Sequence, residues 1–141
     1  MRLDAAIDLR ATAEAVFVVL SDPLRLPEWN ASIVSARRID EEPIGLHSRA
    51  VFAGRFMGQS LESETEVIAF DPPRLFATRA IRGPKVHTQF TLEPQGDVVR
   101  LTVRLSGDVP GGVLGGMVAE RLLGADLQRS LERLRSLCET A

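Results

Sequence analysis

Three segments of the chain alternate between apolar and polar side chains, as half-buried β-strands do. In segment 61–67, Leu61 and Val67 share one face with two hydroxyl residues, and three glutamates occupy the other face. Segments 86–92 and 98–105 alternate in the same way, with Phe90, Leu101 and Val103 among their apolar positions. One side of the predicted sheet is therefore apolar and the other wet, which is typical of an antiparallel sheet covered on one face.

The same patterns predict seven strands, two short helices after the first strand, and a long helix at the C-terminus. We expect the strands at 2–9, 32–39, 48–56, 59–70, 75–81, 86–92 and 98–105. The short helices are expected at 12–20, with Thr12 as N-cap, and at 24–28. Turn signals at 57–58, 71–73 and 94–97 separate consecutive strands.

The C-terminal helix is predicted to run from Gly112 to Glu139. Its large apolar residues recur at steps of four, three and four, on one helix face: Leu127, Leu131, Leu134 and Cys138. Extended toward the N-terminus, the same face carries Met117 and Glu120.

A curved sheet and a straight helix cannot touch along their whole length, so we expect a cavity between them. The C-terminal half of the helix carries leucines, whereas the N-terminal half is rich in glycine, which costs roughly 1 kcal/mol per residue relative to alanine in a helix. An alternative interpretation starts the helix near Met117 and leaves 107–116 as a loop. With either interpretation the N-terminal end of this helix is its less stable end, and we expect the opening of the cavity there.

Composition and charge exclude several functional classes. The chain of 141 residues carries a net charge of −2 without a basic stripe, so nucleic-acid binding is not expected. A single cysteine permits neither an intrachain disulfide nor a cysteine metal cluster. The start lacks the apolar stretch of a signal peptide, and charged residues interrupt the most apolar region. We therefore expect one cytoplasmic domain over 1–141 without integral membrane association; a homodimer stays open.

Several stretches carry a resemblance to a known superfamily: Thr12–Phe17, Leu20–Pro23, Leu26–Trp29, Gly58, Glu66–Arg74 and Gln128–Leu134. On these residues the chain resembles the helix-grip superfamily of START lipid-transfer domains, Bet v 1-like pollen allergens and polyketide cyclase/dehydrase-like (SRPBCC) proteins. The resemblance implies an α+β helix-grip fold, in which a curved seven-stranded antiparallel sheet wraps around the C-terminal helix. It also implies an internal apolar cavity that opens near the start of that helix.

The predicted ligand-binding residues are those expected to face this cavity: Trp29, Phe52, Phe56, Thr65, Phe76, Thr88, Phe90, Leu101, Val103, Met117 and Glu120. Each has a structural alternative. For Trp29 the favoured alternative is a plug between the short helices and the sheet, and for any one phenylalanine it is core packing. The hydroxyls of Ser63, Thr65 and Thr88 either orient a ligand or bond to nearby backbone.

The sequence does not decide which side chains of the third strand face inward, because both of its faces carry apolar residues. Ala50 with Phe52, or Val51 with Ala53, can form the inward-facing pair.

The histidines and the cysteine give no functional signal. His87 falls on the wet face of its strand and His47 at the end of a loop, and neither has a second ligand at helix spacing. No metal site is predicted. Cys138 in the last helical turn is interpreted as buried packing.

Three alternating glutamates, Glu62, Glu64 and Glu66, are interpreted as a solvated strand face paired with Arg79 and Arg82 across the sheet. Because they alternate away from the apolar face, they are not expected to act as catalytic carboxylates.

Three hypotheses about function follow. The first is a binder of a hydrophobic or aromatic small molecule, lipid-like or polyketide-like, which needs no cofactor. The second is a cyclase, dehydratase or hydrolase in the same cavity, with Glu120 as the candidate acid or base and Arg38 or Arg49 polarising a carbonyl. The third is a protein-interaction module with a collapsed cavity.

Overall fold

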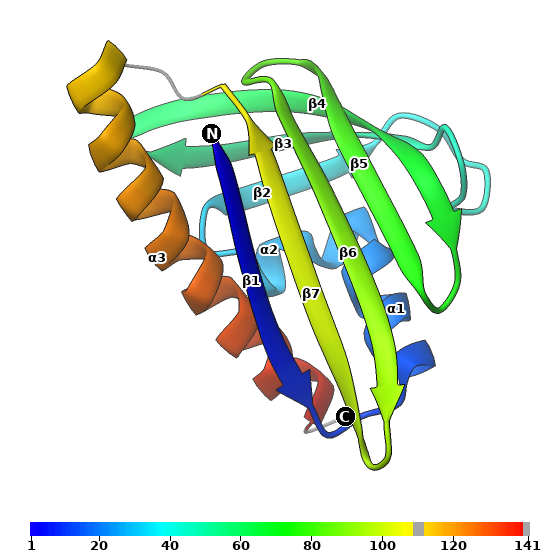
Figure 1. The fold of residues 1–141 in the computed structure, drawn as a ribbon. Helices are drawn as coiled ribbons and strands as arrows, with labels where there is room; N and C mark the ends of the chain where they lie inside the picture. The colour runs from blue at the N-terminus through cyan, green and yellow to red at the C-terminus, as the bar shows by residue number, and fades with distance from the viewer. Residues whose placement is uncertain (109–111, 140–141) are drawn as a thin grey trace.

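The computed structural model describes residues 1–108 and 112–139 and contains a curved antiparallel sheet with helices on its concave side (Figure 1). The seven strands are β1 Arg2–Leu9, β2 Ile33–Arg38, β3 Arg49–Phe56, β4 Gln59–Asp71, β5 Leu75–Arg82, β6 Val86–Gln95 and β7 Val98–Gly107. They are ordered β1-β7-β6-β5-β4-β3-β2, so every pair except β1–β7 joins neighbours in sequence. The predicted helix-grip fold is confirmed.

The helices begin and end at capping residues that the sequence provides. Helix α1, Ala13–Ser21, starts after Thr12, whose hydroxyl accepts a hydrogen bond from the backbone N–H of Ala15 at 3.1 Å. The helix predicted at 24–28 is instead a 3-10 helix, η1 (Pro23–Arg25), followed by α2 (Leu26–Trp29). Pro27 explains the division, because its ring has no N–H and cannot continue a helix begun at Pro23.

Helix α3 spans Gly112–Glu139, as the first of the two interpretations predicts. Its 28 residues correspond to about 42 Å of helix. Figure 1 shows α3 crossing the side of the sheet obliquely, with its C-terminal half near β1 and the short helices.

Two hairpin turns show how local chemistry fixes the register. Between β3 and β4, Met57 and Gly58 have positive φ angles of 52° and 78°, the backbone of a two-residue turn that matches strand twist. The last turn is shorter than predicted, because β6 continues through Pro94 to Gln95. The N–H of Leu92 donates to the Arg74 carbonyl, just before β5 begins. The backbone nitrogen of Pro94 points to the same side two residues later, beyond the end of β5. The strand therefore loses no hydrogen bond to β5 at this proline.

The curvature of the sheet comes from irregular positions and one close approach. The β4–β5 register shifts twice, between Glu64 and Thr65 and between Val67 and Ala69, and such bulges bend and twist a strand. Gly54 lies so close to the Ser32 carbonyl that a side chain there would collide with it.

The hydrophobic core occupies one end of the concave side. It contains the apolar face of α1, the inner faces of β1, β6 and β7, and the C-terminal half of α3. Leu9, Leu101, Leu131 and Leu134 are fully buried there, and the predicted apolar face of α3 is thereby confirmed for its C-terminal half.

Candidate functional site

A pocket of about 340 Å³ lies on the concave face, between the sheet and the middle of α3. Its walls are the inward residues of β2 to β7, together with α2, the segment from Asn30 to Ile33, and α3 from Leu123 to Ser130. The volume is at the lower end of the roughly 300–1,000 Å³ that small-molecule sites span. The lining is mainly apolar, so burial of apolar surface would supply most of the affinity for a guest molecule.

Aromatic rings form one end of the pocket. Trp29 packs edge-on against Phe90 with ring centroids 6.2 Å apart, and Phe76 stacks on Phe90 at the same distance. Trp29 is only 2% exposed, which fits the interpretation as a plug, but it also lines the pocket. Phe52 joins this wall from β3, so Ala50 and Phe52 form the inward pair of that strand.

Hydroxyl groups occupy the central strands of the pocket wall. Ser63 and Thr65 come from β4, Thr78 from β5 and Thr88 from β6, and all four line the pocket. None of these hydroxyls has a hydrogen-bond partner among the described residues, and none is sealed from solvent. They are therefore free to donate to or accept from a ligand.

An arginine faces the pocket from the edge strand. Residues directly opposite on antiparallel strands share a face. Arg38 lies opposite Ala50 and Ala36 opposite Phe52, so both β2 residues belong to the concave face. Arg38 lines the pocket and its side chain is 22% exposed.

A group of polar contacts ties the middle of α3 to the segment after α2. The Ser130 hydroxyl accepts from the backbone N–H of Ala31 at 2.9 Å and donates to the carbonyl of Asp126 at 2.8 Å. The Ser32 hydroxyl donates to the Asp126 carboxylate at 2.7 Å, and Arg129 also bonds that carboxylate. We call these contacts the α3 staple; they mark the place where the helix leaves the core.

Of the residues predicted for the site, most line this pocket: Trp29, Phe52, Phe56, Thr65, Phe76, Thr88, Phe90 and Val103. Three lie elsewhere. Leu101 is fully buried in the core, two residues before Val103 on the same face of β7. Met117 is 64% exposed. Glu120 is partly exposed and is not among the lining residues of α3, which run from Leu123 to Ser130.

Several lining residues were not proposed from the sequence. Thr78 and Ala80 share the inner face of β5 with Phe76, and the alternation of that strand would have indicated them. Asp126 and Ser130 are held by contacts to residues about a hundred positions away, which no local pattern reveals.

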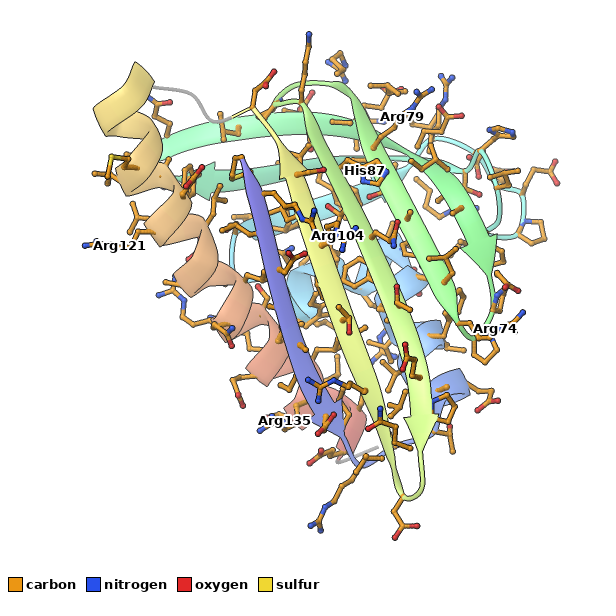
Figure 2. All side chains as sticks on the ribbon, viewed as in Figure 1. Arg74, Arg79, His87, Arg104, Arg121 and Arg135 are labelled. Atoms are coloured by element: carbon orange, nitrogen blue, oxygen red, sulfur yellow. The ribbon has the colours of Figure 1, made fainter. Side chains whose placement is uncertain are left out.

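The convex face carries charge pairs that have no access to the pocket. Glu66 accepts hydrogen bonds from His47 at 2.9 Å and Arg79 at 3.5 Å, and these partners hold the pKa of Glu66 below its ordinary value. Arg82 pairs with Glu62 and Glu64 at 3.5 and 3.6 Å. The predicted pairing with Arg79 and Arg82 is confirmed, and Figure 2 shows Arg79, His87 and Arg104 on this outer side.

Other chemistry is sparse in the described part of the chain. Residues 1–108 and 112–139 contain no group of three or more histidine, cysteine or acidic side chains placed to hold a metal ion. Within the same ranges no helix combines the length and apolarity that a membrane crossing requires. Cys138 is buried, as predicted, and burial raises the pKa of its thiol.

Comparison with known proteins agrees with this geometry. Residues 1–139 match the family model described as "Polyketide cyclase / dehydrase and lipid transport". No curated protein sequence matches the chain.

Solved structures share the fold at low sequence identity. A START superfamily protein from Mycobacterium smegmatis has a TM-score of 0.84 at 23% identity, covering 99% of this chain and 97% of its own. The Zhui aromatase/cyclase from a Streptomyces species has a TM-score of 0.79 at 15% identity, with coverage of 99% and 93%. The major latex-like protein 151 from Panax ginseng has a TM-score of 0.76 at 11% identity, with coverage of 98% and 97%.

Proposed function

The chain belongs to the polyketide cyclase/dehydrase and lipid transport family, and we propose that it binds a hydrophobic or aromatic small molecule between the concave face of its sheet and helix α3. In this proposal residues 1–141 act as one cytoplasmic domain without a cofactor. The observation that carries it is the pocket of about 340 Å³ with a mainly apolar lining. Its size fits a compact guest of one or a few rings better than a long lipid.

Two features of the pocket wall indicate selectivity for a particular ligand, and not equal binding of any apolar compound. The stacked and edge-on rings of Trp29, Phe76 and Phe90 offer a flat apolar surface at one end. Free hydroxyls on β4, β5 and β6 offer hydrogen bonds to a ligand that carries oxygen atoms. A site that is mostly apolar with a few convergent polar groups is the usual form of a small-molecule site.

A direct test is native mass spectrometry of the freshly purified protein, combined with titration of N-phenyl-1-naphthylamine, a neutral dye whose emission rises in apolar surroundings. We expect a reproducible co-purifying mass, and a saturable rise of dye emission that the extracted compound reverses. If no compound is retained and the dye shows no saturable binding, the proposal fails.

A second candidate function is a cyclase or dehydratase that uses the same pocket. The observation in its favour is Arg38, which faces the pocket and can polarise a carbonyl oxygen. Glu120, the acid or base expected from the sequence, lies outside the described lining, and the Asp126 carboxylate is engaged by Ser32 and Arg129. This leaves the enzyme with less support than the binder. Conversion of the co-purifying compound by the wild-type protein, lost in Arg38→Gln, would favour the enzyme.

The third hypothesis, a protein-interaction module with a collapsed cavity, has the least support. A collapsed cavity would have the space beside α3 filled by side chains, whereas a pocket lies there.

A further inference from the structure

The register of the sheet places polar side chains in one row across the pocket wall. Arg38 lies opposite Ala50, Ala50 opposite Thr65, and Thr65 opposite Ala80. Because opposite residues share a face, a line across four neighbouring strands begins with an arginine and continues through small residues and a threonine.

The row continues on the next two strands. Thr78, two residues before Ala80 on the same face of β5, lies opposite Thr88 on β6. We call Arg38, Thr65, Thr78 and Thr88 the polar row. Ala50 and Ala80, the partners of Thr65 on the two neighbouring strands, have small side chains and leave space above the sheet where a ligand can approach the arginine and the hydroxyls.

The guanidinium of Arg38 is fixed in place but has donors to spare. One terminal nitrogen, Nη2, donates to the Asp40 carboxylate at 2.8 Å and also to the backbone carbonyl of Glu42. Asp40 is itself held by the backbone N–H of Arg49 at 3.0 Å, and this bond and the Arg38 guanidinium keep the pKa of Asp40 below its ordinary value. The Asp40–Arg38 pair therefore stays ionised and holds the guanidinium in one orientation.

An arginine side chain has five N–H donors, and Nη2 supplies two of them. The three donors on Nε and Nη1 have no acceptor among the described residues, and neither nitrogen is sealed from solvent. A pre-positioned guanidinium with free donors is a strong partner for an anionic oxygen, because charge-assisted hydrogen bonds are shorter and stronger than neutral ones.

We propose that the pocket prefers amphipathic ligands with one acidic group, a carboxylate or sulfonate, which binds Arg38 while the apolar body lies along the polar row toward Phe76 and Phe90. The inference rests on the proposed function, since it assigns a chemical class to the guest of the same pocket. The hydroxyls of Thr65, Thr78 and Thr88 then bond to further oxygen atoms along the body of the ligand.

Two dyes of the same skeleton test this preference. 8-Anilino-1-naphthalenesulfonate carries a sulfonate, and N-phenyl-1-naphthylamine is its uncharged counterpart. In Arg38→Gln we expect the Kd of the sulfonate dye to rise roughly ten-fold or more, the effect of losing a hydrogen bond to a charged group. The Kd of the neutral dye should stay within about two-fold, since the apolar wall is unchanged.

Arg37→Gln is the matched control, because Arg37 is the preceding residue of β2, is exposed, and points to the opposite face. It should leave both affinities unchanged. If Arg38→Gln does not fold, NMR of the wild-type protein takes its place: the Arg38 Nε–H resonance should shift on addition of the sulfonate dye and not of the neutral one.

The outcomes separate the two proposals. If no compound is retained and neither dye binds the wild-type protein, the proposed function fails and this inference fails with it. If the neutral dye binds but Arg38→Gln weakens both dyes equally, or leaves the sulfonate dye unaffected, the acidic-ligand inference is overturned while the proposed function stands. The same holds if the sulfonate dye does not bind at all, or if the Arg38 resonance shifts equally with both dyes.

Discussion

The two halves of helix α3 differ in how their apolar side chains are buried. In the C-terminal half, Leu131 and Leu134 are fully buried against α1, α2 and the sheet. In the N-terminal half, Met117, Val118 and Leu122 are exposed although they are apolar. One continuous helix is thus anchored at one end and borders an open space toward the other.

The difference teaches that packing and binding compete for the same face of the helix. Where the face carries Leu131 and Leu134 it builds the core, and one to two turns earlier Leu123, Asp126 and Leu127 line the pocket. The α3 staple at Asp126 and Ser130 lies at the border and bonds the helix to the segment after α2. We infer that the staple holds the roof of the pocket at its distance from the sheet.

The largest effect should come from removing an anchor. Leu134→Ala is expected to lower the free energy of unfolding by about 2–5 kcal/mol, the range for large-to-small changes in a core. Met117→Ala, in the exposed half, should change it by about 0.5 kcal/mol or less. Urea unfolding of both variants checks the contrast, and similar losses would show that both halves are packed alike.

Filling the pocket should affect binding rather than stability. Ala80→Phe places a ring on the inner face of β5, where Ala80 lines the pocket. We expect the Kd for N-phenyl-1-naphthylamine to rise roughly ten-fold or more, since the ring occupies the space of the guest. Ala6→Phe, on the exposed face of β1, is the control. Unchanged dye binding in Ala80→Phe would place the dye elsewhere on the protein.

The border between the halves is tested at Ser130. Ser130→Ala removes the acceptor of the part-buried Ala31 N–H, which should lower the free energy of unfolding by about 1 kcal/mol. Ser35→Ala, at an exposed position of β2, should have no measurable effect. If the two variants unfold at the same urea concentration, the staple does not hold the helix.

The smallest effect should be a gain. Gly124 lies inside α3 with no atom near enough to contact an added Cβ, so Gly124→Ala should raise the free energy of unfolding by about 0.5–1 kcal/mol. Gly54→Ala should do the reverse, because its Cβ would collide with the Ser32 carbonyl. A thermal unfolding series measures both, and a loss of stability in Gly124→Ala would mean that the helix is packed closely at that point.

The fold could be predicted from the sequence because the features that specify its helices and strands lie within short segments of the chain. Thr12 caps α1 as predicted, and the alternation around Phe90 assigned the inner face of β6. The long helix was also predicted, and its observed start at Gly112 agrees with one of the two interpretations.

The site was readable only in part, for two physical reasons. On β3, Val51 is buried although it lies on the opposite face from Ala50 and Phe52, so hydrophobicity could not assign the inward side. On α3, the helical repeat continues through Glu120 and Met117, but Met117 is exposed and the helix residues that line the pocket begin only at Leu123. A periodic pattern gives the direction of a side chain and not the distance to its neighbour.

The central claim is that a small apolar molecule lies against the aromatic end of the pocket, and Trp29, the sole tryptophan of the chain, allows this to be measured. Excitation of Trp29 should produce sensitised emission from bound N-phenyl-1-naphthylamine, with saturation at one dye per chain and loss of the signal in Ala80→Phe. Saturable dye binding without energy transfer from Trp29, or transfer that persists undiminished in Ala80→Phe, would contradict the account.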